Sequence, residues 1–166
     1  HERFRRQRQM CIRDSAKPYP SGTQLAEKQE IVLNNGAEVT SIDPAKQAAE
    51  PAFNLGRDLF EGLTVQDKQG KTIPGIAESW QANDNNTVYT FTLRQSQWSN
   101  GDSLTAHDFV YSWQRLIDPK TASPYAWFAA IPGIKNSAKI MKGEAPANTL
   151  GAVSYTHLRA HETHSN

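Results

Sequence analysis

Cysteine is almost absent from this 166-residue chain: Cys11 is the single one, so no disulfide can form within the chain. Long apolar runs are also missing, and no stretch approaches the ~20 residues that a membrane-spanning helix requires. The basic start of the chain is not followed by the apolar segment of a secretory signal. What remains, with 37% hydrophobic and 21% charged residues, is typical of a globular protein long enough for one domain.

Groups that could form a catalytic centre are scarce too. His107 is the one histidine between residues 16 and 152, and it lies on the polar side of a predicted helix, which favours a solvated surface residue. The glycines are isolated in turns, unlike those of a phosphate-binding loop. The carboxylates are scattered, and the sequence pairs no two of them for acid–base chemistry. The composition of residues 16–152 therefore predicts that the protein is not an enzyme and that it holds no cofactor and no metal.

Positive charge is concentrated in the first 15 residues, which hold five arginines, whereas residues 16–152 hold 12 basic and 14 acidic residues. A basic arm can bind nucleic acid, and such a protein would be retained on heparin until residues 1–15 were deleted. Because the body is not basic, we expect no nucleic-acid partner.

Three histidines close the chain: His157, His161 and His164. His157 and His161 are four residues apart, which would put two imidazoles on one helical face. A small metal-dependent hydrolase is therefore an alternative hypothesis, and its test is whether metal binding or activity survives removal of residues 153–166. The surrounding sequence lacks the full His-Glu-x-x-His pattern of a zinc protease.

Periodicity predicts a mixed α/β arrangement. Residues 29–33 are a short apolar run typical of a buried strand, and residues 53–63 have near-helical spacing, with Gly62 as the expected stop. Two short segments flank a turn at 67–70, and residues 87–94 alternate as a half-buried strand does. Further turns are expected at 83–86 and 100–101.

The most regular pattern is an amphipathic helix over residues 105–117, with Thr105 as N-cap and Asp108 completing a capping box. A second helix is expected from 123 through 131 and a third over 136–143. Trp113 lies on the apolar stripe, so we expect it in the core. Trp80, Trp98 and Trp127 are predicted to be hydrophobic anchors rather than an aromatic cage for a ligand.

The stretch IPGIAESWQANDNNTVYTFTLRQSQWSNGDSLTAHDFVYSWQRLIDPKTASPYAW, residues 73–127, resembles the signature region of the periplasmic oligopeptide-binding proteins, the solute receptors of peptide-importing ABC transporters. Upstream, LAEKQEIVLNNGAEVTSIDPAK and RDLFEGLTVQD resemble the start of the same mature proteins. The similarity runs without a gap from about residue 25 to 151. NGDSLTAHDFVYS alone marks the wider family of dipeptide, nickel and oligopeptide receptors, and DPKTASPYA after the helix indicates the oligopeptide branch.

The resemblance implies a fragment of a bilobed, type II periplasmic-binding-protein fold of the α/β class. Residues 16–44 would begin lobe I, and residues 45–152 would form most of a small inserted domain. The implied partners are oligopeptides and, for the full-length protein, the membrane subunits of an ABC permease. The implied location is the periplasm and the implied state a monomer. Receptors for dipeptides, murein peptides or nickel chelates remain open within the same family.

The resemblance also implies site residues. In the family, the irregular segment after the Asp-Pro of SIDPAK runs along the cleft and pairs with peptide main chain, which here gives Gln47, Ala48, Ala49 and Glu50. Relatives have Glu where Ala48 stands and Val where Glu50 stands, so the charge beside the peptide would differ. The tyrosine of Ser-Pro-Tyr, here Tyr125, faces the peptide in the family.

The similarity stops at both ends. Residues 1–15 and 153–166 resemble translated adapter sequence, so we interpret both as non-native tails and the histidine cluster as no metal site. The chain would then lack the second lobe and most of the first. We therefore expect negligible peptide binding by the chain alone, and poor order for the strand at 29–33 because its sheet partners are missing.

Overall fold

The computed structural model describes residues 24, 27–28, 30, 32–156 and 159–163. The chain divides into two compact units, residues 1–34 and 35–166. In the first unit, Glu30, Val32 and Leu33 are irregular and exposed, so the predicted strand at 29–33 is wrong for these residues; Gln29 and Ile31 lie outside the described part. An isolated strand has no ladder partner to pair its backbone groups, and none is present for this one among the described residues.

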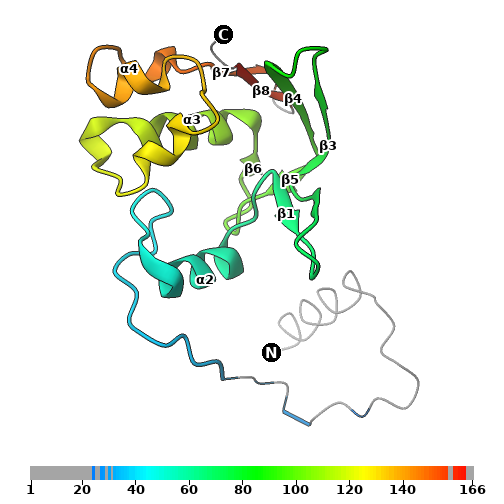
Figure 1. Cartoon of the computed structure of the whole chain (residues 1–166). Helices are drawn as coiled ribbons and strands as arrows, with labels where there is room; N and C mark the ends of the chain where they lie inside the picture. The colour runs from blue at the N-terminus through cyan, green and yellow to red at the C-terminus, as the bar shows by residue number, and fades with distance from the viewer. Residues whose placement is uncertain (1–23, 25–26, 29, 31, 157–158, 164–166) are drawn as a thin grey trace. The chain divides into compact units, whose positions relative to one another are not determined.

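The second unit begins with helix α2, Ala49–Leu59, and continues with short antiparallel strands (Figure 1). Strands β1 (Thr64–Gln66) and β2 (Thr72–Pro74) flank the predicted turn at 67–70, and β5 (Ser96–Gln97) and β6 (Ser103–Leu104) flank the one at 100–101. Helix α3, Ala106–Ile117, follows and has the predicted bounds. No helix in the described part of the chain is long and apolar enough to cross a membrane.

The start and end of α2 differ from the prediction of 53–63. The helix begins four residues earlier, at Ala49, and ends at Leu59 with Phe60 as an extended C-cap. Gly62 does not stop the helix. Its carbonyl accepts a hydrogen bond from the Ile76 N–H at 3.0 Å, and a Cβ on Gly75 would lie 2.6 Å from the same oxygen. The two glycines therefore let the end of β2 pass close to the chain that leaves α2.

The largest sheet has the strand order β3-β4-β8-β7 and is antiparallel throughout. Its strands are β3 (Ala77–Ala82), β4 (Val88–Leu93), β7 (Ala152–Thr156) and β8 (Arg159–Thr163). β4 is the alternating strand predicted at 87–94, and the turn at 83–86 joins it to β3. Residues 153–156 and 159–163, interpreted from sequence as part of a tail, complete this sheet in the structure.

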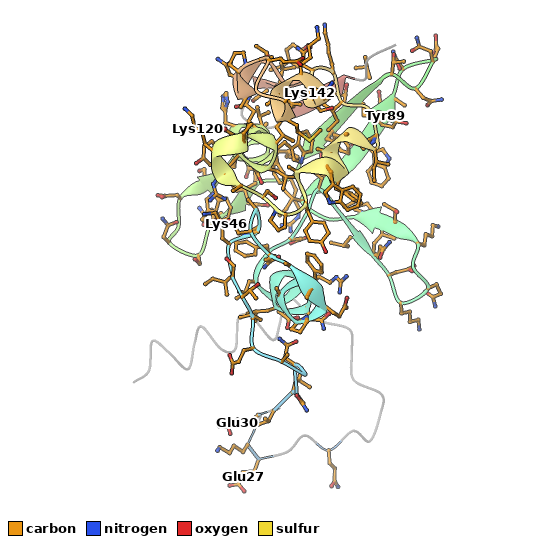
Figure 2. The ribbon with its side chains drawn as sticks, turned by 60° about the vertical axis from the view of Figure 1, so that its left-hand side comes forward. Glu27, Glu30, Lys46, Tyr89, Lys120 and Lys142 are labelled. Atoms are coloured by element: carbon orange, nitrogen blue, oxygen red, sulfur yellow. The ribbon has the colours of Figure 1, made fainter. Side chains whose placement is uncertain are left out.

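Helical segments pack beside this sheet. α3 contacts β7 and β8, and α4 (Ser137–Met141) lies within the third predicted helix (Figure 1). The helix predicted over 123–131 is instead the 3₁₀-helix η2, Ala126–Ala130, after η1, Pro119–Thr121, and before η3, Ala147–Thr149. The side chains of Lys120 and Lys142 are exposed on the outer surface of this helical part (Figure 2).

The apolar stripe of α3 serves two separate hydrophobic clusters. Val110, Trp113 and Ile117 pack with Ile140 and Leu150, whereas Phe109 packs against a second cluster at the start of the sheet. The core position predicted for Trp113 is therefore confirmed. The second cluster contains Ile76, Ala77, Leu93 and Ala106. α3 thus joins the sheet to the helical part and positions the segments that form the site.

Candidate functional site

The segment that enters α2 is held to α3 by an ion pair. Arg115 Nη1 donates to Asp43 Oδ1 and Arg115 Nη2 donates to Asp43 Oδ2, both at 2.6 Å. Asp43 Oδ1 also accepts from the Ala45 N–H at 3.1 Å. These hydrogen bonds, the Arg115 ones above all, lower the pKa of Asp43 to about 2 although partial burial opposes the shift, and the same contact raises the pKa of Arg115. A two-pronged pair of this kind fixes orientation as well as distance.

Gln47 closes the turn between this anchor and α2. Its side chain is buried, and its amide lies against Gly56, where a Cβ would come within 2.6 Å of Oε1. Nε2 has no hydrogen-bond partner among the described residues. Only glycine at position 56 leaves room for this amide, so the sequence of α2 and the conformation of the entering segment depend on each other.

The predicted contact residues 48–50 follow directly after the Asp43–Arg115 ion pair and the Gln47 side chain, at the start of α2. Ala48 is extended, with φ −143° and ψ 146°. Ala49 follows at a φ of +67°, a conformation that residues other than glycine rarely adopt. Glu50 is exposed and lies 3.6 Å from Arg57 of the next turns. Ala49 and Glu50 are exposed and Ala48 is half-buried, so this stretch of backbone lies at the surface. Backbone strain of this kind is concentrated at binding and catalytic sites.

Tyr125 contacts the same helix. Its ring meets Phe53 of α2 edge-to-face, with the centroids 5.3 Å apart. The ring centroid of Trp127 also lies 6.1 Å from that of Tyr125, and the centroid of Phe128 lies 5.9 Å from that of Trp127. Phe53 follows Glu50 by three residues and so shares its side of the helix. The structure therefore places the predicted tyrosine against the helix that begins with Ala49 and Glu50, although the two are far apart in sequence.

Sequence reasoning missed two residues of this arrangement. Phe53 was expected only as a helix residue, and Trp127 as a hydrophobic anchor. Trp127 is 55% exposed, and Trp80 and Trp98 are also exposed, so the three are not buried anchors in the described part of the chain. The aromatic residues of SPYAWF were the one sign in the sequence of this cluster. The contact of Tyr125 with Phe53 joins residues far apart in the chain, so their spacing does not reveal it.

His107, which the sequence also singled out, is exposed on α3, as expected. His157 and His164 fall outside the described residues, and His161 is placed by its backbone alone, opposite Thr90 in the sheet. Among the side chains that the structure describes, no three histidines, cysteines or carboxylates are grouped to hold a metal ion. The basic residues 1–15 also lie outside the described part.

Comparison with known proteins identifies relatives of this chain. Residues 71–149 match the family described as bacterial extracellular solute-binding proteins, family 5 middle. The chain is 51% identical over 140 residues to the periplasmic murein peptide-binding protein of Escherichia coli (strain K12) and 51% identical over 138 residues to the periplasmic oligopeptide-binding protein of Salmonella typhimurium. These matches cover 84% and 82% of this chain but 26% and 25% of the relatives, so the chain spans about a quarter of their length.

Solved structures give the same result. The unliganded open form of a periplasmic murein tripeptide-binding protein matches with a TM-score of 0.84 and 48% identity, over 89% of this chain and 28% of that one. The oligopeptide receptor OppA of Haemophilus influenzae, in complex with RPPGFSPFR, matches with a TM-score of 0.83 and 43% identity, over 86% and 28%. The fold is therefore part of the fold of these solute-binding proteins, as the sequence predicted.

Proposed function

Because this chain belongs to the bacterial extracellular solute-binding proteins of family 5, we propose that it is part of a receptor that binds oligopeptides for import by an ABC transporter. The observation that carries this proposal is the match at about 50% identity, over more than four fifths of the chain, to receptors named for oligopeptides and murein peptides. Both classes of ligand are short peptides. The proposal therefore covers murein peptides as well as ordinary oligopeptides.

Binding in this proposal relies on main-chain groups of residues 48–50. Ala48 is extended and can pair with an extended ligand as a neighbouring strand would. The first amides of a helix have no acceptor within the helix, and Ala48, as N-cap, has no side-chain oxygen to bond them. Because every peptide has the same main chain, such contacts bind peptides of many sequences. Glu50 adds a negative charge beside the ligand.

Tyr125 supplies the side-chain contact, supported by Phe53 and Trp127. Aromatic rings offer apolar area with little loss of conformational freedom, which suits contact with varied ligand side chains. Residues 16–44 would belong to lobe I and 45–152 to the inserted domain. The complete receptor would be a periplasmic monomer that delivers its ligand to the permease and performs no catalysis.

The first test is peptide binding by calorimetry. We expect the full-length receptor, obtained by extending the reading frame in the source DNA, to bind tri- to pentapeptides at micromolar or lower Kd. The 166-residue chain, which spans a quarter of its relatives, should bind the same peptides more weakly than millimolar. A full-length receptor that binds none of these peptides would contradict the proposal.

Variants of the full-length receptor test the named residues. Replacing Tyr125 by alanine should weaken binding about tenfold, or about 1.4 kcal/mol. Ala48→Gly, which keeps the main-chain groups and adds no side-chain oxygen to bond the helix amides, should bind nearly as wild type does. A ligand in which one backbone amide is replaced by an ester loses a donor and should bind several-fold more weakly if main-chain pairing holds the peptide. Equal affinity for the ester and the amide would refute the backbone role.

A further inference from the structure

The chain contains the dipeptide Asn-Gly twice, at residues 35–36 and 100–101. Asparagine followed by glycine is especially prone to deamidation, because glycine has no side chain to obstruct the approach of its backbone nitrogen to the asparagine side chain. This reaction is one reason that asparagine is a thermolabile residue. The two pairs share the same reacting groups, so the fold decides how far their rates differ.

The pair at 100–101 is held in the turn of the β5–β6 hairpin. The Gly101 N–H donates to the Trp98 carbonyl at 2.9 Å, so the nitrogen that would attack is already engaged. The Asn100 side chain is bonded at both ends to Asp102: its Nδ2 donates to the carboxylate at 2.7 Å, and its Oδ1 accepts from the backbone N–H at 3.0 Å. The nearby carboxylate also disfavours loss of the Gly101 proton. The hairpin therefore protects Asn100 from this reaction.

The pair at 35–36 has different surroundings. Residues 32–38 contain no helix or strand, and every one of them is exposed. Backbone of this kind rearranges at little cost in free energy, which lets the Gly36 nitrogen reach the geometry of attack. The Asn35 Nδ2 donates to the carbonyl of Pro51, in the first turn of α2, at 2.9 Å. This exposed hydrogen bond joins the reactive side chain to the helix that carries the candidate site.

From this contrast we propose that Asn35 is a site of spontaneous deamidation, whereas the fold protects Asn100. The Gly36 backbone nitrogen gives its proton to hydroxide and bonds to the side-chain carbon of Asn35. The bond from that carbon to Nδ2 breaks, and Nδ2 takes a proton from water and leaves as ammonia. Water then opens the resulting succinimide ring at either carbonyl carbon, which gives aspartate or isoaspartate. Water is the only co-reactant.

The reaction also breaks a contact of the candidate site. The nitrogen that leaves is the one that donates to the Pro51 carbonyl, and Pro51 directly follows the proposed contact residues 48–50. The carboxylate that replaces the amide can only accept hydrogen bonds, so it cannot restore this one. Deamidation at residue 35 should therefore change the surroundings of the first turn of α2.

Peptide mapping by mass spectrometry tests the site of reaction. The 166-residue chain is incubated at pH 8, both folded and in urea, and conversion at each Asn-Gly pair is followed as a gain of one mass unit. In urea we expect similar rates at Asn35 and Asn100, because the local sequence alone then acts. In the folded chain, Asn100 should react at least about tenfold more slowly than Asn35, because its hairpin must open first. Asn35→Gln should remove the product at residue 35, because its longer side chain forms the ring far more slowly.

Equal rates at the two pairs in the folded chain would overturn the proposal, as would faster reaction at Asn100. A large difference that persists in urea would also overturn it, since the local sequence and not the fold would then be responsible.

Amide NMR spectra test the link to α2. Asn35→Asp reproduces one product of the reaction, and Asn100→Asp is the matched control in the hairpin. We expect Asn35→Asp to shift the amide resonances of residues 49–53 and Asn100→Asp to leave them in place. Resonances that stay unmoved in Asn35→Asp, or that move equally in both variants, would show that deamidation at residue 35 does not act on the start of α2.

Discussion

Asp43 and Arg115, 72 residues apart, form a two-pronged ion pair that ties the segment entering α2 to the last turn of α3. Both side chains are about two thirds buried. The pair forms one end of a short rigid stretch whose other end is the amide of Gln47 against Gly56. The proposed contact residues 48–50 follow immediately. Their position therefore depends on α3, which contributes the anchoring Arg115 but none of the proposed contact residues.

The first prediction concerns acid stability. The pKa of Asp43 is about 2 in the folded chain and 3.8 without these contacts, so its contribution is fully present above pH 3.8 and is lost as the pH falls through about 2. Asp43→Asn should remove that contribution, and the acid transition should move to higher pH. Circular dichroism across pH 1.5 to 5 measures it. Asp84→Asn, in the exposed turn at 83–86, should leave the transition unchanged.

The second prediction concerns backbone strain at Ala49. A left-handed conformation costs an L-residue roughly 1–2 kcal/mol, and glycine does not incur this cost. Ala49→Gly should therefore raise the free energy of unfolding by about 0.5–1 kcal/mol. Ala48→Gly is the matched control, since φ at residue 48 is −143° and glycine relieves nothing there. Urea titration followed by tryptophan fluorescence would show the difference, and an equal loss in both variants would contradict strain at residue 49.

The third prediction concerns the contact between Gln47 and Gly56. Alanine within a helix is normally more stable than glycine by about 0.5–1 kcal/mol. Gly56→Ala should nevertheless destabilise the chain, because its Cβ would force the buried Gln47 amide to move. In a Gln47→Ala background the same substitution should stabilise. The double-mutant cycle should give a coupling energy of about 1 kcal/mol or more, and a coupling near zero would show that the amide moves freely.

The fourth prediction concerns the start of α3. Asp108 Oδ2 accepts from the Thr105 N–H at 2.7 Å and from Thr105 Oγ1 at 3.0 Å. Asp108→Ala removes both bonds and should cost about 1 kcal/mol. Ser112→Ala, on an exposed position of the same helix, should change stability by less than about 0.5 kcal/mol. If thermal unfolding shifts equally in both variants, the capping interaction does not stabilise the helix.

The fifth prediction concerns the terminal histidines. A synthetic peptide of residues 153–166 should not bind Zn²⁺ at micromolar concentration, since a short peptide does not hold its three histidines, His157, His161 and His164, in a preformed site. Isothermal titration measures this. Micromolar or tighter binding, together with activity lost on removal of residues 153–166, would restore the hydrolase hypothesis. The source DNA decides whether these residues are native.

Local patterns in the sequence predicted α3, the strand at 88–93 and the turns between short strands, because spacing and capping act within a few residues. The resemblance carried by residues 73–127 predicted the family and its fold. The strand at 29–33 was predicted wrongly for the described residues, because an apolar run forms a strand only beside partner strands, and the described part of the chain places none there. The bounds of α2 were missed because its first residue has an unfavourable backbone conformation, which propensity does not anticipate.

Tertiary structure alone decided the candidate site and an exposed hollow. Three contacts could not be read from the sequence, because nothing in the spacing of their residues indicates them. They are Tyr125 with Phe53, the Gln47 amide against Gly56, and the ion pair of Asp43 with Arg115. Likewise, the sequence marks Trp98 and Tyr111 as apolar, but only the arrangement of α2, α3 and the β5–β6 hairpin shows that they line one exposed hollow. The sequence by itself determined α3, β4 and the turns between the short strands, and the family that they resemble. The packing of those segments determined which side chains meet and which apolar surface is left uncovered, because such contacts depend on positions in space that local periodicity does not encode.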